Sequence, residues 1–390
     1  MPSKIKKRSN NTYLLTVAGG YDNQGKQKSY TKTIRATSDR EAEKEYIAFA
    51  AAIQRGEIIT TKKLKLVDFA WQWYHDYCEK NLAPKTQQTY KNYLEQRIIP
   101  LLGHLDLNKL NPRHIIRFIN EMKEHGKRLD GKEGNISDET IRYCFRVLSS
   151  MLKDAVQWQI IPSSPCERVK PPKVAKHRAA VLNEEDTRIM LNYLENEPIK
   201  YQAIIIVAVS TGMRLGEIMG LQWSDIDFSV DTLTVNRTNQ VIKGRGIITK
   251  TPKNDASARS LTLPKRTIEI LKRYKKWQNE QRLLLGDLWN DSDWIFTTWN
   301  GTSMYPTTPS KWFREFLKRN DLPHIPFHGL RHTSATLLIA QGAPLKNISS
   351  RLGHADIRTT GNIYGHALQS VDRKLADTMD VILGDVADKK

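Results

Sequence analysis

Hydrophobic residues recur at helical spacing through most of this chain, and only short stretches alternate as strands do. In residues 64–165 the apolar positions fall at steps of three and four, as on one face of an amphipathic helix. Four helices are expected, with starts near Leu66, Pro84, Pro112 and Ser137, and Pro100 is expected to close the second. The pattern therefore predicts a helical-bundle domain over residues 64–165.

Residues 1–63 have the pattern of a small basic α+β domain. Residues 12–18 and 29–34 are rich in β-branched and aromatic residues, and a glycine-containing run between them is typical of a turn. Ser38 and Glu41 then form a capping-box pattern at the start of a helix. We expect two strands followed by one helix.

Residues 179–390 are predicted to form a third domain that is mainly α. Asn183 suits a helix N-cap, and a buried helix is expected over residues 201–209. Three short strands of a small sheet are expected at residues 233–236, 241–248 and 259–263. Residues 166–178, rich in proline and lysine, are predicted to form a stiff basic linker. The fold class is thus multidomain, mainly α with small β-sheets.

The charge balance narrows the class of partner. The 390 residues include 61 Lys and Arg against 42 Asp and Glu, a formal net charge of +19. So large an excess favours a polyanion, and nucleic acid first, because neutralising phosphates releases counterions. A soluble protein that happens to be basic is the alternative on charge alone.

The cysteines and the hydropathy of the sequence indicate the cellular compartment of the protein. Cys78, Cys144 and Cys166 stand far apart, with neither a zinc spacing nor a disulfide framework, which fits a reducing cytosol. The longest apolar run, residues 203–209, falls far short of the roughly 20 residues of a membrane span. The basic N-terminus has no apolar stretch behind it, so no signal peptide is expected there. We expect a soluble, cytoplasmic protein.

Two arginines are candidates for binding one phosphodiester. Arg214 follows a glycine turn, and Arg331 comes three residues after His328. On a helix, residues three apart share a face with Cβ atoms about 5–6 Å apart, so His328 and Arg331 could reach the same phosphate. Arginine suits the task because its planar fork binds phosphate bidentately and keeps its proton. A structural ion pair between Arg214 and Glu217 is the alternative.

A histidine and a tyrosine extend the pattern. His354 follows Leu352-Gly353, a predicted turn, and Tyr364 comes ten residues later. Free tyrosine, with a pKa near 10, is a poor nucleophile, and nearby cations would favour its phenolate. Ordinary aromatic packing is the alternative for Tyr364.

Zinc is an alternative partner for the histidines. His328 and His332 have the four-residue spacing of a helical ligand pair. No glutamate lies between them, and the cationic Arg331 would oppose a metal ion. We therefore expect neither a metal nor a cofactor.

Taken together, these residues resemble the tyrosine recombinases of the phage-integrase family. That family's pattern is Arg, a β-hairpin Lys, His-x-x-Arg, His or Trp, and then Tyr, and this sequence has every element in that order. Residues 328–333 and 352–364 are similar to the sequences that the family usually has at these two motifs. The resemblance extends more loosely to the first two domains, which look like the arm-binding and core-binding domains of phage and conjugative-transposon integrases.

The resemblance implies a site-specific recombinase that forms a covalent 3′-phosphotyrosyl intermediate. The implied catalytic residues are Arg214, Lys253, His328, Arg331, His354 and the nucleophile Tyr364. Lys253 has the better spacing to the family's Ser-x-Arg strand, which in this sequence is Ser257-Ala258-Arg259, and Lys250 is its alternative.

The implied partners are core-type and arm-type attachment sites in double-stranded DNA, a homotetramer on DNA, an excisionase and a host DNA-bending protein. No membrane partner is expected. Candidate phosphate contacts in the helical domain, each of which also fits ordinary surface charge, are Lys85, Lys91, Arg97, Arg142 and Arg146.

Two other functions fit part of the pattern. A type IB topoisomerase shares the catalytic set, but the basic N-terminal domain argues for a second DNA site that a topoisomerase does not require. A catalytically silent DNA-binding regulator would need no complete catalytic set.

Overall fold

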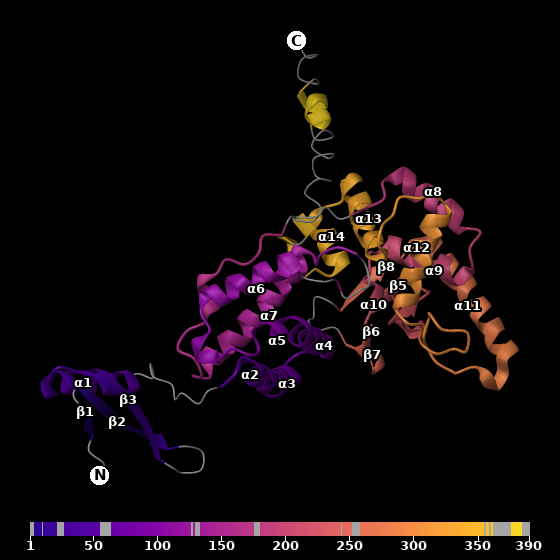
Figure 1. Ribbon diagram of the computed structural model, residues 1–390. Helices are drawn as coiled ribbons and strands as arrows, with labels where there is room; N and C mark the ends of the chain where they lie inside the picture. The colour runs from indigo at the N-terminus through magenta and orange to yellow at the C-terminus, as the bar shows by residue number, and fades with distance from the viewer. Residues whose placement is uncertain are drawn as a thin grey trace. The chain divides into compact units, whose positions relative to one another are not determined.

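The structure is a computed structural model that describes residues 4–9, 11–21, 27–54, 64–125, 128, 133–174, 180–242, 244–251, 258–354, 356–358, 360–361 and 376–383. The chain divides into two compact units, residues 1–175 and 176–390 (Figure 1). Buried apolar residues gather in separate clusters for the N-terminal sheet, the helical bundle and the third domain. No helix within these ranges is long and apolar enough to cross a membrane.

The N-terminal domain is a three-stranded antiparallel sheet with one helix. Its strands β1 (Ile5–Ser9), β2 (Thr12–Tyr21) and β3 (Gln27–Arg35) lie in sequence order, and α1 (Asp39–Gln54) packs on them. Alternate residues of β2 point inward, as a strand with one buried face requires. The predicted strands and helix correspond to β2, β3 and α1, and β1 was not predicted, because its residues after Ile5 are polar and exposed and show no alternation.

The predicted capping box forms only in part. Ser38 Oγ accepts a bond from the Glu41 N–H at 3.3 Å, as expected. The Glu41 carboxylate, however, accepts from the Thr37 N–H at 2.6 Å, one residue before the predicted partner. The first turn is therefore capped from both residues that precede it.

The helical domain contains every predicted helix. The segments are α2 (Leu66–Trp73), a π-helical turn (Tyr74–Cys78), α3 (Glu79–Asn81), α4 (Pro84–Tyr93), a second π-helical turn (Leu94–Ile98), α5 (Ile99–Leu102), α6 (Pro112–His125) and α7 (Asp138–Gln157). Ser137 caps α7 by accepting from the Thr140 N–H at 3.3 Å. Cys166 and Val169, which the sequence analysis assigned to the linker, are buried in this domain's core.

The prediction that Pro100 closes the second helix is wrong. The helix continues through Pro100 to Leu102. The turn just before it is π-helical, and the Ile99 N–H donates to the Leu94 carbonyl five residues back. Because proline cannot donate and its ring crowds the preceding turn, this widened turn lets the helix continue where a regular one would break.

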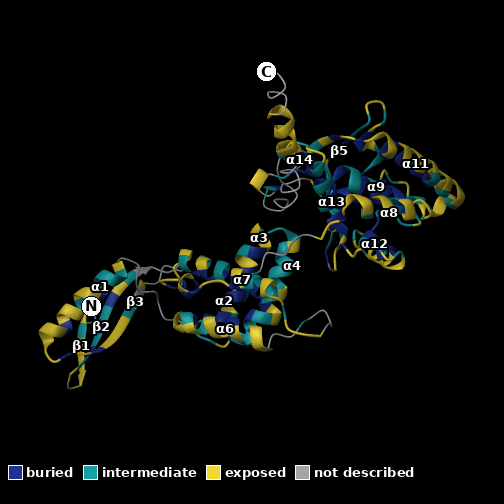
Figure 2. Ribbon diagram, turned by 90° about the horizontal axis from the view of Figure 1, so that it is seen from above, coloured by how far each residue is buried: buried dark blue, intermediate teal, exposed yellow. Residues whose placement is uncertain are grey.

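The third domain surrounds one buried helix. The helix α9 (Ile199–Thr211) packs against α11 (Lys265–Leu285) and α13 (Phe327–Ala340). Figure 2 shows α9 largely buried and much of α11 exposed. Further helices of this domain are α8 (Glu184–Leu194), α10 (Leu215–Ile218), α12 (Thr307–Arg319) and α14 (Leu345–Leu352). Asn183 caps α8, as predicted, by accepting from the Asp186 N–H at 2.7 Å.

Two small antiparallel sheets complete this domain. One has the order β4 (Ile226–Asp227), β5 (Thr232–Val235), β8 (Arg259–Thr262), and the other is the hairpin of β6 (Thr238–Ile242) and β7 (Gly246–Lys250). The single strand predicted over residues 241–248 is wrong. Gly244 and Gly246 have φ values of +79° and +71°, which glycine adopts without strain, so the chain reverses there.

Candidate active site

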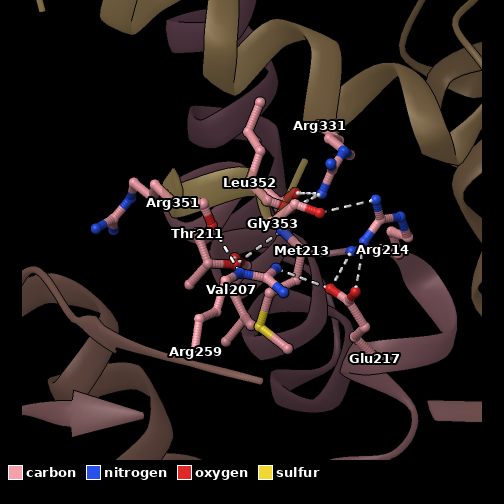
Figure 3. Close-up of polar contacts among 11 residues, drawn as sticks. Val207, Thr211, Met213, Arg214, Glu217, Arg259, Arg331, Arg351, Leu352 and Gly353 are labelled. Carbon is pink, nitrogen blue, oxygen red and sulfur yellow. Dashed lines mark hydrogen bonds and ion pairs between the residues drawn. The ribbon is translucent and has the colours of Figure 1, made fainter. Parts of the chain in front are cut away.

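The turn between α9 and α10 places the first candidate arginine. Gly212 ends α9 in the left-handed conformation, and a Cβ there would lie 2.5 Å from Cδ2 of Leu352. Thr211 Oγ1 donates to the Val207 carbonyl at 2.6 Å and accepts from the Met213 N–H at 3.2 Å (Figure 3). The turn therefore packs directly on the end of α14, and glycine is required for it.

Arg214 makes the ion pair with Glu217 that was the alternative to the predicted phosphate grip, and it also contacts the turn after α14. Its Nη1 donates to Glu217 Oε1 at 2.8 Å, and its backbone N–H donates to Glu217 Oε2 at 3.0 Å. Its Nη2 donates to the Gly353 carbonyl at 3.2 Å. The side chain remains 42% exposed, so the ion pair orients the guanidinium without enclosing it.

Glu217 lies between two arginines. Its side chain is 8% exposed, and Oε2 accepts from Arg259 Nη2 at 2.9 Å. Burial alone raises the pKa of Glu217, but the bonds and charge of Arg259 and the bonds from Arg214 outweigh it, so the pKa is lowered. The carboxylate therefore stays ionised and holds both guanidinium groups.

Arg331 comes from α13 and reaches the same region from another side. It is 2% exposed, and its Nη1 donates to the carbonyls of Gly212 and Leu352, both at 2.8 Å. One guanidinium thus joins the turn after α9 to the turn after α14. His328 lies one helical turn before it on α13, as the spacing predicted.

Three consecutive carbonyls at the end of α14 accept bonds from three different arginines. The carbonyl of Arg351 accepts from Arg259 Nε at 2.7 Å, that of Leu352 from Arg331, and that of Gly353 from Arg214 (Figure 3). Carbonyls at a helix C-terminus lack helical partners and carry partial negative charge, so they attract cations. We call residues 351–353 with these three arginines the arginine clasp.

His354 follows directly after the clasp. Gly353 has a φ of +68°, and this left-handed residue turns the chain so that His354 leaves the axis of α14. The Nδ1 atom of His354 lies 2.9 Å from Thr360 Oγ1, which orients the ring. Arg214, Arg331 and His354 are therefore brought together by the structure.

The histidines at this site have low basicity. Desolvation lowers the pKa of His354 to about 4, with further lowering by Arg331 and Arg214. Desolvation also lowers the pKa of His332 to about 4, and the His328 ring lies 4.8 Å away, edge to face. The pKa of His328 is lowered by desolvation and then by Arg331 and Arg214. His332 and His354 are therefore neutral near pH 7.

Two predicted catalytic residues, Lys253 and Tyr364, lie outside the described residues. Lys250, the alternative lysine, ends β7 and pairs with Thr238 across the hairpin. Arg259 starts β8, as the Ser-x-Arg strand predicted. Among the residues that the structure describes, no group of three His, Cys, Asp or Glu side chains could hold a metal ion.

The five candidate DNA contacts of the helical domain come from neighbouring helices. Lys85 and Lys91 lie on α4, Arg97 on the π-helical turn that follows it, and Arg142 and Arg146 on α7. The helices are joined by stacked rings of Tyr93 and Tyr143, 5.1 Å apart. Lys91 also pairs with Glu95 at 3.9 Å, a surface pair of little strength. Their role in DNA binding stays a prediction.

Sequence reasoning missed two residues of the site. It named Arg259 only as a marker for the lysine, and it did not single out Thr360. Arg259 bonds the carbonyl of Arg351, which lies 92 residues away in the chain. Thr360 contacts His354, only six residues away. Only the short His354–Thr360 spacing could have suggested a contact.

Known proteins and family models match most of this chain. The model of the Phage integrase family matches residues 180–370, and that of the Phage integrase N-terminal SAM-like domain matches residues 65–123. The ICEBs1 integrase of Bacillus subtilis (strain 168) is 26% identical over 388 residues, which cover 97% of this chain and 100% of that protein. A protein called Tyrosine recombinase XerC-like, from Caldanaerobacter subterraneus subsp. tengcongensis, is 27% identical, covering 94% of this chain and 95% of its own.

Solved structures share the fold. The Tn1549 transposon integrase in complex with circular intermediate DNA has a TM-score of 0.66 at 18% identity, covering 80% of this chain and 99% of that chain. A lambda integrase tetramer bound to a Holliday junction has a TM-score of 0.56 at 18% identity, covering 93% and 95%. The predicted fold class, mainly α with small sheets, is confirmed.

The depressed histidine pKa values predict a loss of stability in mild acid. Between the ordinary pKa of about 6.5 and the folded value of about 4, the unfolded chain binds more protons than the folded one. The stability held by neutral His354 is complete above the ordinary pKa and is lost as pH falls toward the folded pKa.

We expect His354→Gln to lose less unfolding free energy than the wild type when the pH is lowered from about 7 to about 5, measured by urea denaturation. His324→Gln, at an exposed histidine of the same domain, is the control and should keep the wild-type pH dependence. Equal pH dependence in all three proteins would contradict the prediction.

Proposed function

Because this chain belongs to the phage integrase family and is a tyrosine-type site-specific DNA recombinase, we propose that Tyr364 attacks the scissile phosphate beside the arginine clasp. The observation that carries the proposal is the meeting of Arg214, Arg331 and His354 at residues 352–354. Two arginines and a neutral histidine can bond the non-bridging oxygens of a phosphodiester and stabilise the negative charge that grows on them during the reaction. The clasp would hold the arginines in place before DNA binds.

In the proposed first step, the phenolate oxygen of Tyr364 bonds to phosphorus and the bond from phosphorus to the 5′ oxygen breaks. The product is a 3′-phosphotyrosyl ester and a free 5′-hydroxyl. Arg214 and Arg331 hold the non-bridging oxygens, whose charge grows in the transition state. Lys253 gives its proton to the leaving 5′ oxygen.

The second step reverses the first with a new strand. The 5′-hydroxyl of a partner duplex attacks the phosphotyrosine and releases Tyr364. The phosphotyrosyl ester conserves the energy of the broken phosphodiester bond, so no nucleoside triphosphate is consumed. His328 and His354 donate or accept protons and bond the phosphate. A bound phosphate would raise their pKa values, because a nearby anion favours the charged imidazole.

The proposal assigns the other domains to DNA binding. The basic N-terminal domain binds arm-type sites, and the helical domain binds core-type sites through Lys85, Lys91, Arg97, Arg142 and Arg146. Four copies act together on two duplexes, with an excisionase and a host DNA-bending protein as accessory partners. We place the protein in the cytoplasm, because DNA is its substrate and its three buried cysteines suit a reducing compartment.

The nucleophile is tested by trapping the covalent intermediate. The protein is mixed with a nicked duplex that carries its own attachment site, denatured, and examined for a covalent protein–DNA band. We expect the band from the wild type and none from Tyr364→Phe, because the phenyl ring has no attacking oxygen. Tyr305→Phe, at a half-exposed tyrosine of the same domain, is the control and should give the band. A band from Tyr364→Phe would exclude Tyr364 as the nucleophile.

The general acid is tested with a substrate whose leaving 5′ oxygen is replaced by sulfur. A thiolate leaves without a proton, so it needs no acid. Lys253→Ala should slow cleavage of the ordinary substrate about 10²–10⁴-fold and cleave the sulfur substrate at nearly the wild-type rate. Lys250→Ala is the matched control. If Lys250→Ala shows this pattern instead, Lys250 is the acid.

The C-terminal segment is proposed to dock on a neighbouring subunit. Residues 376–383 are helical, and Met379 and Ile382 are 51% and 55% exposed. Val371 and Leu375, which share their helical spacing in the sequence, lie outside the described residues. Packing on its own domain is the alternative.

Deleting residues from 371 onward should leave single-site DNA binding intact and impair assembly, because the proposed docking contact is removed. Gel-shift experiments separate single-site complexes from higher assemblies. Unchanged assembly and unchanged recombination by the truncated chain would refute the docking.

A further inference from the structure

We propose that Arg259 is a positioning residue that couples the phosphate grip of Arg214 to the turn that carries His354. The inference rests on the proposed function, because it takes Arg214 and His354 as residues that touch the DNA phosphate. Arg259 itself is not expected to touch DNA. Its side chain is 8% exposed, and a Cβ on Gly353 would lie 2.8 Å from its Nη1.

Arg259 joins two parts of the site with one rigid group. Its Nε donates to the Arg351 carbonyl at 2.7 Å, and its Nη2 donates to Glu217 Oε2 at 2.9 Å. Its backbone is held in the sheet, where it pairs with Val235 of β5. A planar guanidinium with fixed N–H directions therefore sets the distance between Glu217 and the end of α14.

The contacts form a closed circuit. From Arg259 the path runs through Glu217 to Arg214, from Arg214 to the Gly353 carbonyl, and along the backbone to the Arg351 carbonyl, which Arg259 also holds. A shift of Glu217 would therefore move Arg214, and a shift of the helix end would move His354. Arg259 is the member that restrains both.

Arg259 also adjusts the charge that Arg214 presents. Glu217 divides one negative charge between two arginines, which leaves the group of three with a net positive charge. Without Arg259, the Glu217 carboxylate would neutralise Arg214 alone. The attraction of Arg214 for a phosphate would then be weaker, since a like-sized opposite charge lies 2.8 Å from it.

Lysine cannot replace Arg259 in this arrangement. The two acceptors are bound by different nitrogens of the guanidinium, Nε and Nη2. Lysine has one nitrogen at the end of a flexible chain, so it keeps the charge but loses the fixed spacing. Arg259→Lys therefore separates positioning from net charge.

The test measures single-turnover cleavage of a saturating nicked attachment-site duplex by the full-length protein. We expect Arg259→Lys to slow cleavage about 100-fold, as a small misplacement of catalytic groups does, with DNA affinity within about threefold of wild type. The matched control is Arg237→Lys, which alters the ion pair between a partly buried arginine and the buried Asp225 in the same domain. The control should cleave within about threefold of the wild-type rate.

A double-mutant cycle distinguishes positioning through Glu217 from a general structural effect. If Arg259 acts through Glu217, Arg259→Lys should slow a Glu217→Gln protein by no more than about threefold further. If the two substitutions acted independently, their rate losses would multiply instead. Circular dichroism and thermal unfolding check that each variant is folded. If Arg259→Lys does not fold, Glu217→Gln alone must slow cleavage comparably.

Failure of the positioning role can be distinguished from failure of the proposed function. Wild-type cleavage with an undiminished rate in Arg259→Lys would overturn the positioning role and leave the proposed function standing. So would multiplying effects in the cycle, or an equal loss in Arg237→Lys. Absence of any covalent adduct from the wild type on its own site would overturn both proposals.

Discussion

The catalytic domain depends on one arrangement, in which the last carbonyls of α14 accept bonds from arginines of three separate elements. Arg214 precedes α10, Arg259 starts β8 and Arg331 lies on α13. A helix C-terminus leaves carbonyls without partners, and here those groups become the shared anchor for the cations. Elements far apart in the chain are thus brought to one point, and His354 follows directly after it.

This anchor resolves an electrostatic difficulty. Three arginines close together repel one another, and a phosphate site needs them close together before the phosphate arrives. The helix end supplies partial negative charge, and Glu217 supplies one full charge that two arginines share. These negative charges reduce the repulsion between the arginines, and a net positive charge remains at the site. Desolvation is the main cause of the low pKa values of His332 and His354, and the charge of Arg331 lowers both further.

Helical periodicity predicted the helices well, and the failures have local physical causes. Pro100 does not end its helix because a π-helical turn accommodates it, and the strand over residues 241–248 breaks because two glycines adopt positive φ. At the site, spacing and family resemblance together named Arg214, His328, Arg331 and His354. Arg259 could not be assigned its role, because its contacts with Glu217 and the Arg351 carbonyl exist only after the sheet and α14 have packed.

The arginine clasp grips the main chain, and this has a consequence for how the segment can vary. Its acceptors are carbonyl oxygens, which every amino acid possesses, so the bonds themselves do not depend on which side chains occupy residues 351 and 352. They depend on the count of residues between α14 and His354. Inserting or deleting one residue there would bring a different carbonyl to each arginine and rotate the histidine away. Apart from Gly353, whose positive φ requires glycine, these bonds therefore constrain the length of the segment more strictly than its choice of amino acids.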